Sequence, residues 1–256
     1  MTNPKKEYAD RGPIAEGEIE AMLKKTGGIE RMYFRFRVRA LIGLLKKFGK
    51  RRREFSTLRM KDLEVREKES VQGQHLFVTF TIAKKHKKGL FQYLKELKKT
   101  GNPELLNRPH PELVADWKTW QETGEGHKFK EVKTTKTVDV RDKYCKLILE
   151  YVEFVKANYP GSVFLFPSGR NVFGKSYVVF NDAHLSGSQL LRLIKQLNPQ
   201  VWLHLFRELK GKEISEKLGR TLASVSAVQD FLDLERPETA MHYVKRFAPS
   251  EAEAEY

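Results

Sequence analysis

Three residues near the C-terminal end have the types and spacing that phosphate chemistry requires. His204 and Arg207 lie three positions apart in a segment whose apolar residues recur at helical spacing, so both fall on one face of a helix. Pro237 suits the first turn of a later helix, which carries Tyr243 about two turns further on. These side chains could bind a phosphate and supply an oxygen nucleophile. Most such pairs are a surface arginine near a core histidine, so the spacing alone does not establish a site.

A second motif, upstream of the first, strengthens the interpretation of these three residues as a phosphate site. It has a glycine-containing turn and an arginine, followed by a glutamate, a leucine and an aspartate: Gly49, Arg51, Glu54, Leu58 and Asp62. This pattern resembles the first signature of the tyrosine recombinase (integrase) family. The H-x-x-R pair and the later tyrosine match the second signature in the right order. The resemblance spans about residues 12–247 and implies a mostly α-helical, α+β fold with a small β-hairpin or sheet, like the family's catalytic domain.

The resemblance implies site-specific recombination, integration or excision, through a 3′-phosphotyrosyl intermediate. Tyr243 would attack phosphorus, Arg51 and Arg207 would neutralise the phosphate oxygens, and His204 would bond the phosphate and handle a proton. Glu54 would orient an arginine or the neighbouring helices. The covalent link conserves the bond energy, so no cofactor is expected. The sequence also shows no convincing carboxylate cluster at metal-ligand spacing.

Two segments have strand character, about residues 75–82 and 129–140. In the family such segments form one hairpin, but the residues between them are far more than a hairpin turn uses. We therefore expect an insertion at about 89–128, which contains two candidate helices at about 90–99 and 111–121.

A lysine of the hairpin should protonate the leaving 5′-oxygen. Lys84 and Lys85 follow the first strand directly and are the first candidates, while Lys133 and Lys136 on the second strand are their rivals. The residues expected to contact DNA in addition are Arg52, Lys87, Lys133 and Lys136.

The sequence departs from the family pattern at two places. The family usually has a histidine or tryptophan nine residues before the tyrosine, within L-G-H, whereas this chain has Leu232, Asp233 and Leu234. Either His242 or another group compensates, or the site is slower. The residue after Arg207 is a glutamate where the family often has histidine. Such departures, and the charged composition, resemble those of archaeal and viral integrases.

Composition agrees with a polyanionic partner. The 256 residues include 48 Lys and Arg against 33 Asp and Glu, a net charge of +15, which favours double-stranded DNA over a membrane. A solvated surface rich in lysine and glutamate would give a similar count. Cys145 is the only cysteine and is expected to be buried and inert. No signal peptide or membrane-spanning run is present, so an intracellular, DNA-associated protein is expected.

The expected organisation is a loose arm at 1–13, a catalytic domain at 14–247 and an acidic tail at 248–256. The family's N-terminal DNA-clamping domain has no counterpart before Arg51, so a catalytic fragment or a minimal form is expected. Self-association on DNA is also expected from the resemblance. Further helices are predicted at about 15–25, 30–48, 51–60, 142–157, 186 or 188 to 197, 213–219 and 224–232.

Three other functions stay open. A type IB topoisomerase-like enzyme would use the same residues to relax supercoiled DNA. A non-catalytic DNA-binding protein could keep the fold and lose turnover, for which Leu234 is the warning sign. A basic RNA-binding protein is the third, although no RNA-recognition motif is present.

Overall fold

The computed structural model describes residues 12–69, 71–87, 90–99, 109–122, 127–171 and 177–248. The chain divides into two compact units, one of residues 1–80 with 135–256 and one of residues 81–134. The arm expected at 1–13 and the tail expected at 248–256 lie almost wholly outside the described residues. None of the helices described is long and apolar enough to cross a lipid bilayer.

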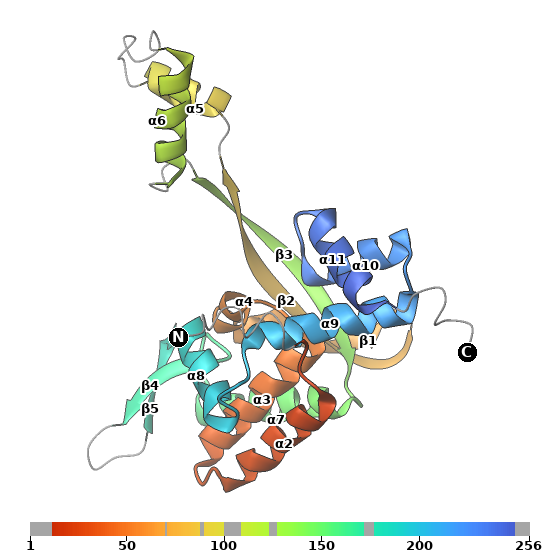
Figure 1. Ribbon diagram of the computed structural model, residues 1–256. Helices are drawn as coiled ribbons and strands as arrows, with labels where there is room; N and C mark the ends of the chain where they lie inside the picture. The colour runs from red at the N-terminus through yellow and green to blue at the C-terminus, as the bar shows by residue number, and fades with distance from the viewer. Residues whose placement is uncertain are drawn as a thin grey trace, which may run out of the picture. The chain divides into compact units, whose positions relative to one another are not determined.

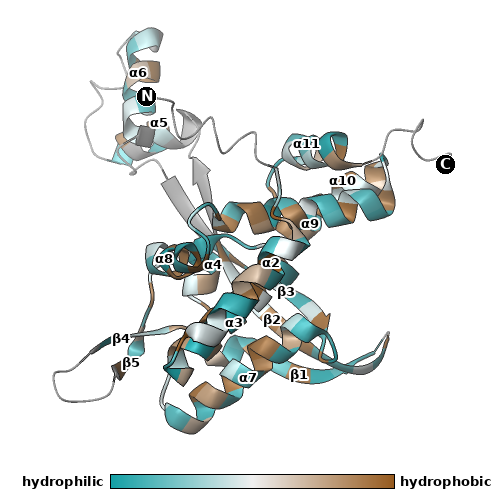
Figure 2. Ribbon diagram, turned by 60° about the horizontal axis from the view of Figure 1, so that its bottom comes forward, coloured by the Kyte–Doolittle hydropathy of each residue, from teal (hydrophilic) through white to brown (hydrophobic). Residues whose placement is uncertain are grey.

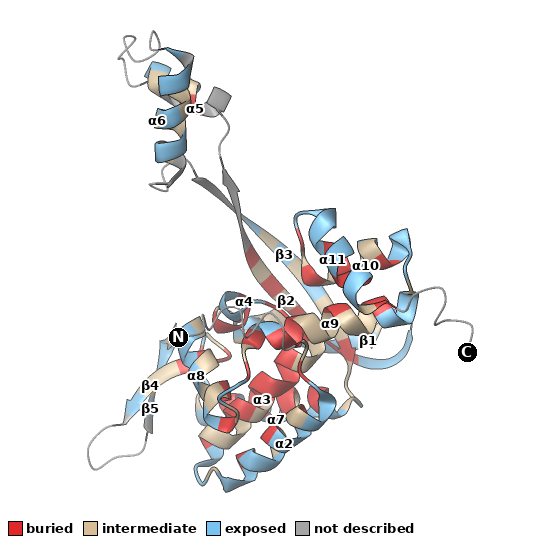
Figure 3. Cartoon of the chain, in the orientation of Figure 1, coloured by how far each residue is buried: buried red, intermediate tan, exposed pale blue. Residues whose placement is uncertain are grey.

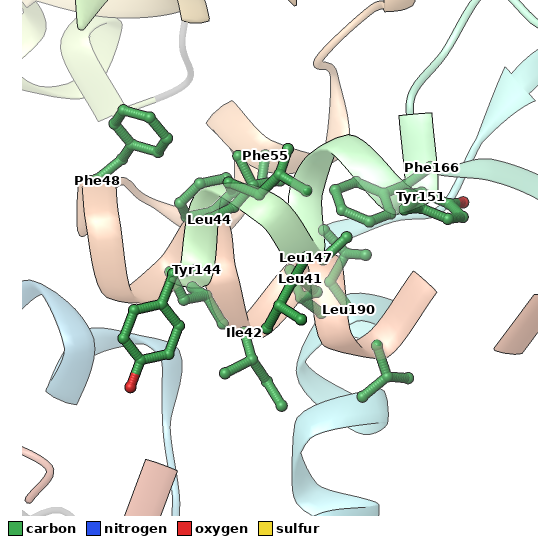
Figure 4. Packing of buried hydrophobic residues seen from close by; sticks show 14 of the residues in the cluster. Leu41, Ile42, Leu44, Phe48, Phe55, Tyr144, Leu147, Tyr151, Phe166 and Leu190 are labelled. Carbon is green, nitrogen blue, oxygen red and sulfur yellow. The ribbon is translucent and has the colours of Figure 1, made fainter. Parts of the chain in front are cut away.

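The first unit is built around two helices, α3 (Met32–Phe48) and α7 (Lys143–Asn158), which pack against each other. Helix α3 is buried on every side over residues 40–45, whereas α7 buries one apolar face, as the colours of the two labelled ribbons in Figure 3 show. Leu41 and Leu44 of α3 lie with Tyr151 of α7 in the cluster of Figure 4. Each such side chain contributes about 1.5–3 kcal/mol when fully buried. Helices α2 (Glu16–Lys25) and α8 (Gly187–Leu197) also contact α3.

Local signals account for where several helices begin. Asp142 accepts hydrogen bonds from the backbone N–H groups of Tyr144 and Cys145, which caps the start of α7. Ser186 accepts from Gln189 at the start of α8, so Ser186 rather than Ser188 is the cap. In Figure 2 the helices carry hydrophobic and hydrophilic residues in alternating bands, as amphipathic helices do.

Cys145 has no solvent-exposed surface, as the sequence predicts for an inert thiol. Burial raises the pKa of its thiol to about 12, so the reactive thiolate is not formed near neutral pH.

Two small antiparallel sheets accompany the helices. In the larger sheet β1 (Leu63–Lys68) pairs with β2 (Val71–Lys87), and β3 (His127–Asp139) bonds the other edge of β2. In the smaller, β4 (Pro167–Asn171) pairs with β5 (Tyr177–His184). The predicted α+β fold, mostly helical with a small sheet, is confirmed.

The second unit holds the two helices expected inside the insertion. They are α5 (Leu90–Lys99) and α6 (His110–Glu122). The ring centroids of Tyr93 and Trp120 lie 5.1 Å apart, which joins the two helices through an aromatic contact.

The C-terminal part of the first unit consists of α9 (Leu203–Leu218), α10 (Leu222–Leu232) and α11 (Pro237–Phe247). Helix α9 contacts α3 as well as α10 and α11 (Figure 1). Helices α10 and α11 bury an apolar cluster of their own, separate from the main core: Val228, Leu232, Leu234, Ala240, Tyr243, Val244 and Ala248.

The helix predicted from Arg51 through Met60 is wrong beyond its first turns. Helix α4 covers only Arg52–Ser56. The backbone that follows bonds across to a distant segment, because Leu58 O accepts from Leu165 N at 2.9 Å and Met60 N donates to Val163 O at 3.0 Å. This pairing with residues 163–165 replaces the helical hydrogen bonds of the predicted continuation.

Other elements also differ from the predictions. The strand predicted at 75–82 covers residues 71–87, so Lys84 and Lys85 lie on it and not past its end. The separate helix predicted at 213–219 belongs to α9, which continues unbroken from Leu203. Helix α10 begins at Leu222, two residues before the predicted start, because Thr221 caps it by accepting from Ser224 N. Strand β1 was not predicted, since four of its six residues are charged and glutamate and lysine are uncommon in strands.

Candidate functional site

A pocket of about 460 Å³ in the first unit brings the two sequence motifs together. It is lined by residues from α4 and the turn before it, α8, α9, the α10–α11 connection and α11: Lys50, Arg51, Arg52, Leu191, Trp202, Leu203, His204, Arg207, Leu234, Thr239 and Tyr243. Arg51, His204, Arg207 and Tyr243, predicted from three separate segments, therefore share one cavity.

A left-handed glycine sets the position of Arg51. Gly49 has φ of +54° and ends α3, so the chain turns sharply just before the arginine. Glu54 contacts Arg51 twice. Its carboxylate accepts a hydrogen bond from the Arg51 backbone N–H at 2.8 Å and lies 3.4 Å from the Arg51 guanidinium. Glu54 is buried, whereas about half of the Arg51 side chain is exposed to the pocket and solvent. Glu54 thus orients the Arg51 guanidinium, while the rest of that group stays accessible to a ligand in the pocket.

Helix α9 carries His204 and Arg207 at very different depths. The His204 side chain is 63% exposed, and its Nε2 lies 3.5 Å from the Glu208 carboxylate one turn on. Arg207 is buried, and it donates to Gly49 O at 3.3 Å and to Leu232 O. Arg207 therefore links the Arg51 turn to the end of α10.

Tyr243 lies on α11, which begins at Pro237 with Glu238 in its first turn, as the sequence predicts. The tyrosine ring is buried against α9 at Gly211. A Cβ atom at Gly211 would lie 2.3 Å from Cδ1 of Tyr243, so any larger residue would displace the ring. A glycine four residues after Arg207 thus lets the tyrosine helix approach the H-x-x-R helix.

Leu234, one of the two departures from the tyrosine recombinase pattern that the sequence resembles, also lies in this pocket. Leu234 is buried and lines the cavity, so the pocket that holds the two arginines also contains an apolar side chain. Asp233, before it, has φ of +51° and forms the left-handed cap of α10. His242 is exposed, and its ring centroid lies 6.5 Å from that of Tyr243.

Burial and the neighbouring charges shift the pKa values of His204 and Tyr243 in the pocket. Desolvation lowers the pKa of His204 below 6.5, with the cations of Arg207 and Arg51 adding to the effect and Glu208 opposing it. Burial raises the pKa of Tyr243 above 10, while Arg207 and Arg51 oppose the rise. The two arginines thus lie within electrostatic reach of both the histidine and the phenol.

The predicted lysines are not all placed by the structure. Lys84, Lys85 and Lys87 lie on β2, but their side chains are outside the described residues. Lys133, on the part of β3 within the second unit, is exposed. Lys136 belongs to the first unit and donates to Asp230 O of α10 at 2.7 Å.

Arg52 lies at the start of α4 and lines the pocket beside Arg51. Its side chain packs on Gly187 at the start of α8, where a Cβ would lie 2.9 Å from Cγ of Arg52.

Sequence reasoning missed Lys50, Gly211 and Asp233. Lys50 had no predicted role, yet its side chain is fully buried and paired with Asp233. The signal for Gly211 was available, since an isolated glycine inside a helix costs about 1 kcal/mol relative to alanine and implies a packing reason. The signal for Lys50 is absent from the sequence, because its partner lies 183 residues away.

Chemically, the pocket combines two arginines, a histidine and a phenol. Arginines suit the non-bridging oxygens of a phosphodiester, because the guanidinium stays charged and donates in a planar fork. Among the described residues, no group of three or more His, Cys, Asp or Glu side chains is arranged to hold a metal ion.

Neither a protein-family model nor a curated protein sequence matches this chain. Solved structures do match. One is the XerH site-specific recombinase bound to palindromic difH in a post-cleavage complex, at 16% identity and a TM-score of 0.50, covering 92% of this chain and 50% of that chain. Another is XerH with difH in a pre-cleavage complex, at 17% identity and a TM-score of 0.49, covering 90% and 49%. The chain spans about half the length of the recombinases it matches, and at this identity the likeness shows a tyrosine recombinase-like fold.

Proposed function

We propose that this protein cleaves and rejoins DNA strands as a site-specific tyrosine recombinase. The observation that carries the proposal is the shared pocket of Arg51, His204, Arg207 and Tyr243. These four residues were selected from sequence motifs, and they converge in a fold similar to that of a DNA-bound recombinase. The net charge of +15 supports double-stranded DNA as the partner.

In the proposed cleavage step, the Tyr243 oxygen attacks phosphorus and the bond from phosphorus to the 5′-oxygen breaks. The phenol proton passes to His204, whose ring lines the same pocket and is exposed enough to accept it. Arg51 and Arg207 stabilise the charge on the non-bridging oxygens. The products are a 3′-phosphotyrosyl link and a free 5′-hydroxyl. Reversal of the step on another strand completes recombination without a cofactor.

Glu54 acts as a positioning residue in this scheme. It contacts both the backbone N–H and the guanidinium of Arg51, so it can fix the direction of the Arg51 side chain. Because the Glu54 carboxylate is buried while much of Arg51 is exposed, the support does not compete with substrate for the outer face of the guanidinium.

The leaving 5′-oxygen takes its proton from a lysine, for which we propose Lys84 or Lys85. General acid catalysis is typically worth ~10²–10⁴ in rate, so alanine at the acting lysine should slow cleavage by about that factor. A substrate with a 5′-bridging sulfur needs no proton and should restore most of the rate. Lys136 is the matched rival, because its ammonium group contacts α10 of the same unit as the pocket. If the sulfur substrate restored the rate of Lys136→Ala but not that of Lys84→Ala or Lys85→Ala, the general acid would be Lys136 on β3.

The nucleophile is tested by trapping a covalent adduct on nicked duplexes that carry candidate sites. Tyr243→Phe removes one oxygen and leaves the ring packed on Gly211, so folding and DNA binding should be retained while the adduct disappears. Tyr256→Phe, in the acidic tail, is the matched control and should form adduct like wild type. A phosphotyrosyl peptide at any residue other than Tyr243, found by mapping the modified peptide, would overturn the proposal.

Leu234 supports a second candidate, a DNA-binding protein of the same fold with weakened catalysis. This apolar side chain lines the pocket where the family usually has a phosphate hydrogen-bonder. Specific DNA binding without adduct on any nicked substrate would favour this candidate. Relaxation of supercoiled DNA without strand exchange would instead favour a type IB topoisomerase-like enzyme. Self-association on DNA, proposed for the recombinase, is tested by measuring the mass of the complex on paired sites.

A further inference from the structure

The C-terminal turn of α10 receives a cation from each of three distant segments. The carbonyl oxygens of residues 230 to 232 accept, in that order, from Lys136 of β3, from Lys50 of the turn before α4 and from Arg207 of α9. The lysine contacts measure 2.7 Å and 2.9 Å. The last carbonyls of a helix lack partners within the helix and carry its negative dipole end, so cations stabilise them.

Lys50 makes the deepest of these contacts. Its side chain has no exposed surface, and its ammonium group also pairs with the Asp233 carboxylate. The rings of Phe80 and Phe231 enclose it, with centroids 5.5 Å and 5.8 Å from Nζ. A buried lysine is costly unless it is paired, so this one is committed to the end of α10 rather than to solvent.

Asp233 connects this pair to the tyrosine helix. Its left-handed backbone ends α10, and α11 starts four residues later at Pro237. Helices α10 and α11 share an apolar cluster that is separate from the main core. Where these two helices lie on the rest of the unit therefore depends on α9 and on the polar contacts at the end of α10.

We propose that Lys50 and Asp233 are positioning residues, whose pairing sets where the α10–α11 segment, and so the Tyr243 hydroxyl, lies over Arg51 and Arg207. This inference rests on the proposed function. The pair joins the residue directly before Arg51 to the turn that leads into the tyrosine helix, and thus ties the two sequence motifs together. Replacing both members of a buried ion pair with apolar groups is often neutral for stability, whereas removing one partner is destabilising. The test of the pair must therefore separate the placement of Tyr243 from the folding of the protein.

A double-mutant cycle tests the pair. Lys50→Met keeps the length of the side chain and removes the cation, and Asp233→Asn removes the charge with a residue that tolerates the left-handed backbone. We measure the rate constant and final yield of adduct on a nicked substrate in excess over protein, together with DNA affinity. The yield reports the fraction of competent protein, and the rate constant reports how the tyrosine is placed.

Each single variant should slow adduct formation, by about 10–100-fold for Lys50→Met, since a misplacement near 1 Å can cost about 10²-fold. The final yield and the DNA affinity should stay within twofold of wild type. The double variant should be no slower than Lys50→Met, because the two changes break one contact. Lys156→Met, which removes an exposed lysine paired with Glu153 on α7, is the matched control and should match wild type. Additive losses, or an unchanged rate in Lys50→Met, would overturn the proposal.

Hydrogen exchange tests the role of the Lys50–Asp233 pair independently of the proposed recombinase function. Lys50→Met should raise the exchange rate of α11 amides by about tenfold while α3 amides stay protected, whether or not the protein cleaves DNA. Wild-type protein without adduct would reject the recombinase function alone. Unchanged exchange in α11 would reject the positioning pair even if Tyr243 forms adduct normally.

Discussion

Substituting Gly211 with alanine is the smallest change that should displace the proposed nucleophile. The added Cβ would lie 2.3 Å from Cδ1, 2.9 Å from Cε1 and 3.0 Å from Cγ of Tyr243. Carbon atoms in contact normally sit about 3.5–4.0 Å apart, so the ring must move by more than 1 Å. Because the Tyr243 ring is buried between α9 and α11, it cannot move without disturbing the packing that holds its hydroxyl in the pocket.

The size of the effect follows from that displacement. Overpacking costs about 1–3 kcal/mol, and alanine returns about 1 kcal/mol of helix propensity, so the protein should stay folded. A nucleophile displaced by about 1 Å can lose about 10²-fold in rate. We therefore expect adduct formation on a nicked substrate to slow by about 10²-fold at saturating DNA, with DNA affinity unchanged.

The matched control is Gly17→Ala in α2, where an added Cβ meets nothing within 4 Å. That variant should cleave like wild type. If Gly211→Ala cleaved at the wild-type rate, the Tyr243 ring would not rest against α9 during the reaction. A loss of affinity equal to the loss of rate would point to a general disturbance of α9 instead.

Three further predictions concern charge. Burial lowers the pKa of Lys50 from 10.5 to about 8, with Lys136 adding to the effect and Asp233 and Glu54 opposing it. Between these values the unfolded chain binds more protons than the folded one, so the free energy of unfolding of wild type should rise relative to that of Lys50→Met as the pH increases from about 8 to 10.5, measured by denaturant titration. Leu234→His adds a donor to the pocket, and a hydrogen bond to a charged group is worth about 1.5–3 kcal/mol, so cleavage should be about tenfold faster or more in the adduct assay. DNA binding with about six phosphate contacts should weaken with a log–log salt slope near −5, measured by titration, and a flat dependence would argue against a nucleic-acid partner.

The sequence by itself determined the features that depend on neighbouring residues. Asp142 caps α7 and Gly49 ends α3, as local capping rules predict. The two motifs also determined four of the pocket's residues, because Arg51, His204, Arg207 and Tyr243 had the right types and order.

Only the tertiary structure decided the features that depend on distant partners. The helix predicted after Arg51 stops early because residues 58–60 bond to residues 163–165, a pairing with no local signal. Lys50 looks like one more surface cation until Asp233, 183 residues away, is placed beside it. Residue type and spacing report on short-range geometry, whereas burial and long-range hydrogen bonds arise only when the segments pack together. The contacts that bring Tyr243 and the two arginines into one pocket are of this second kind.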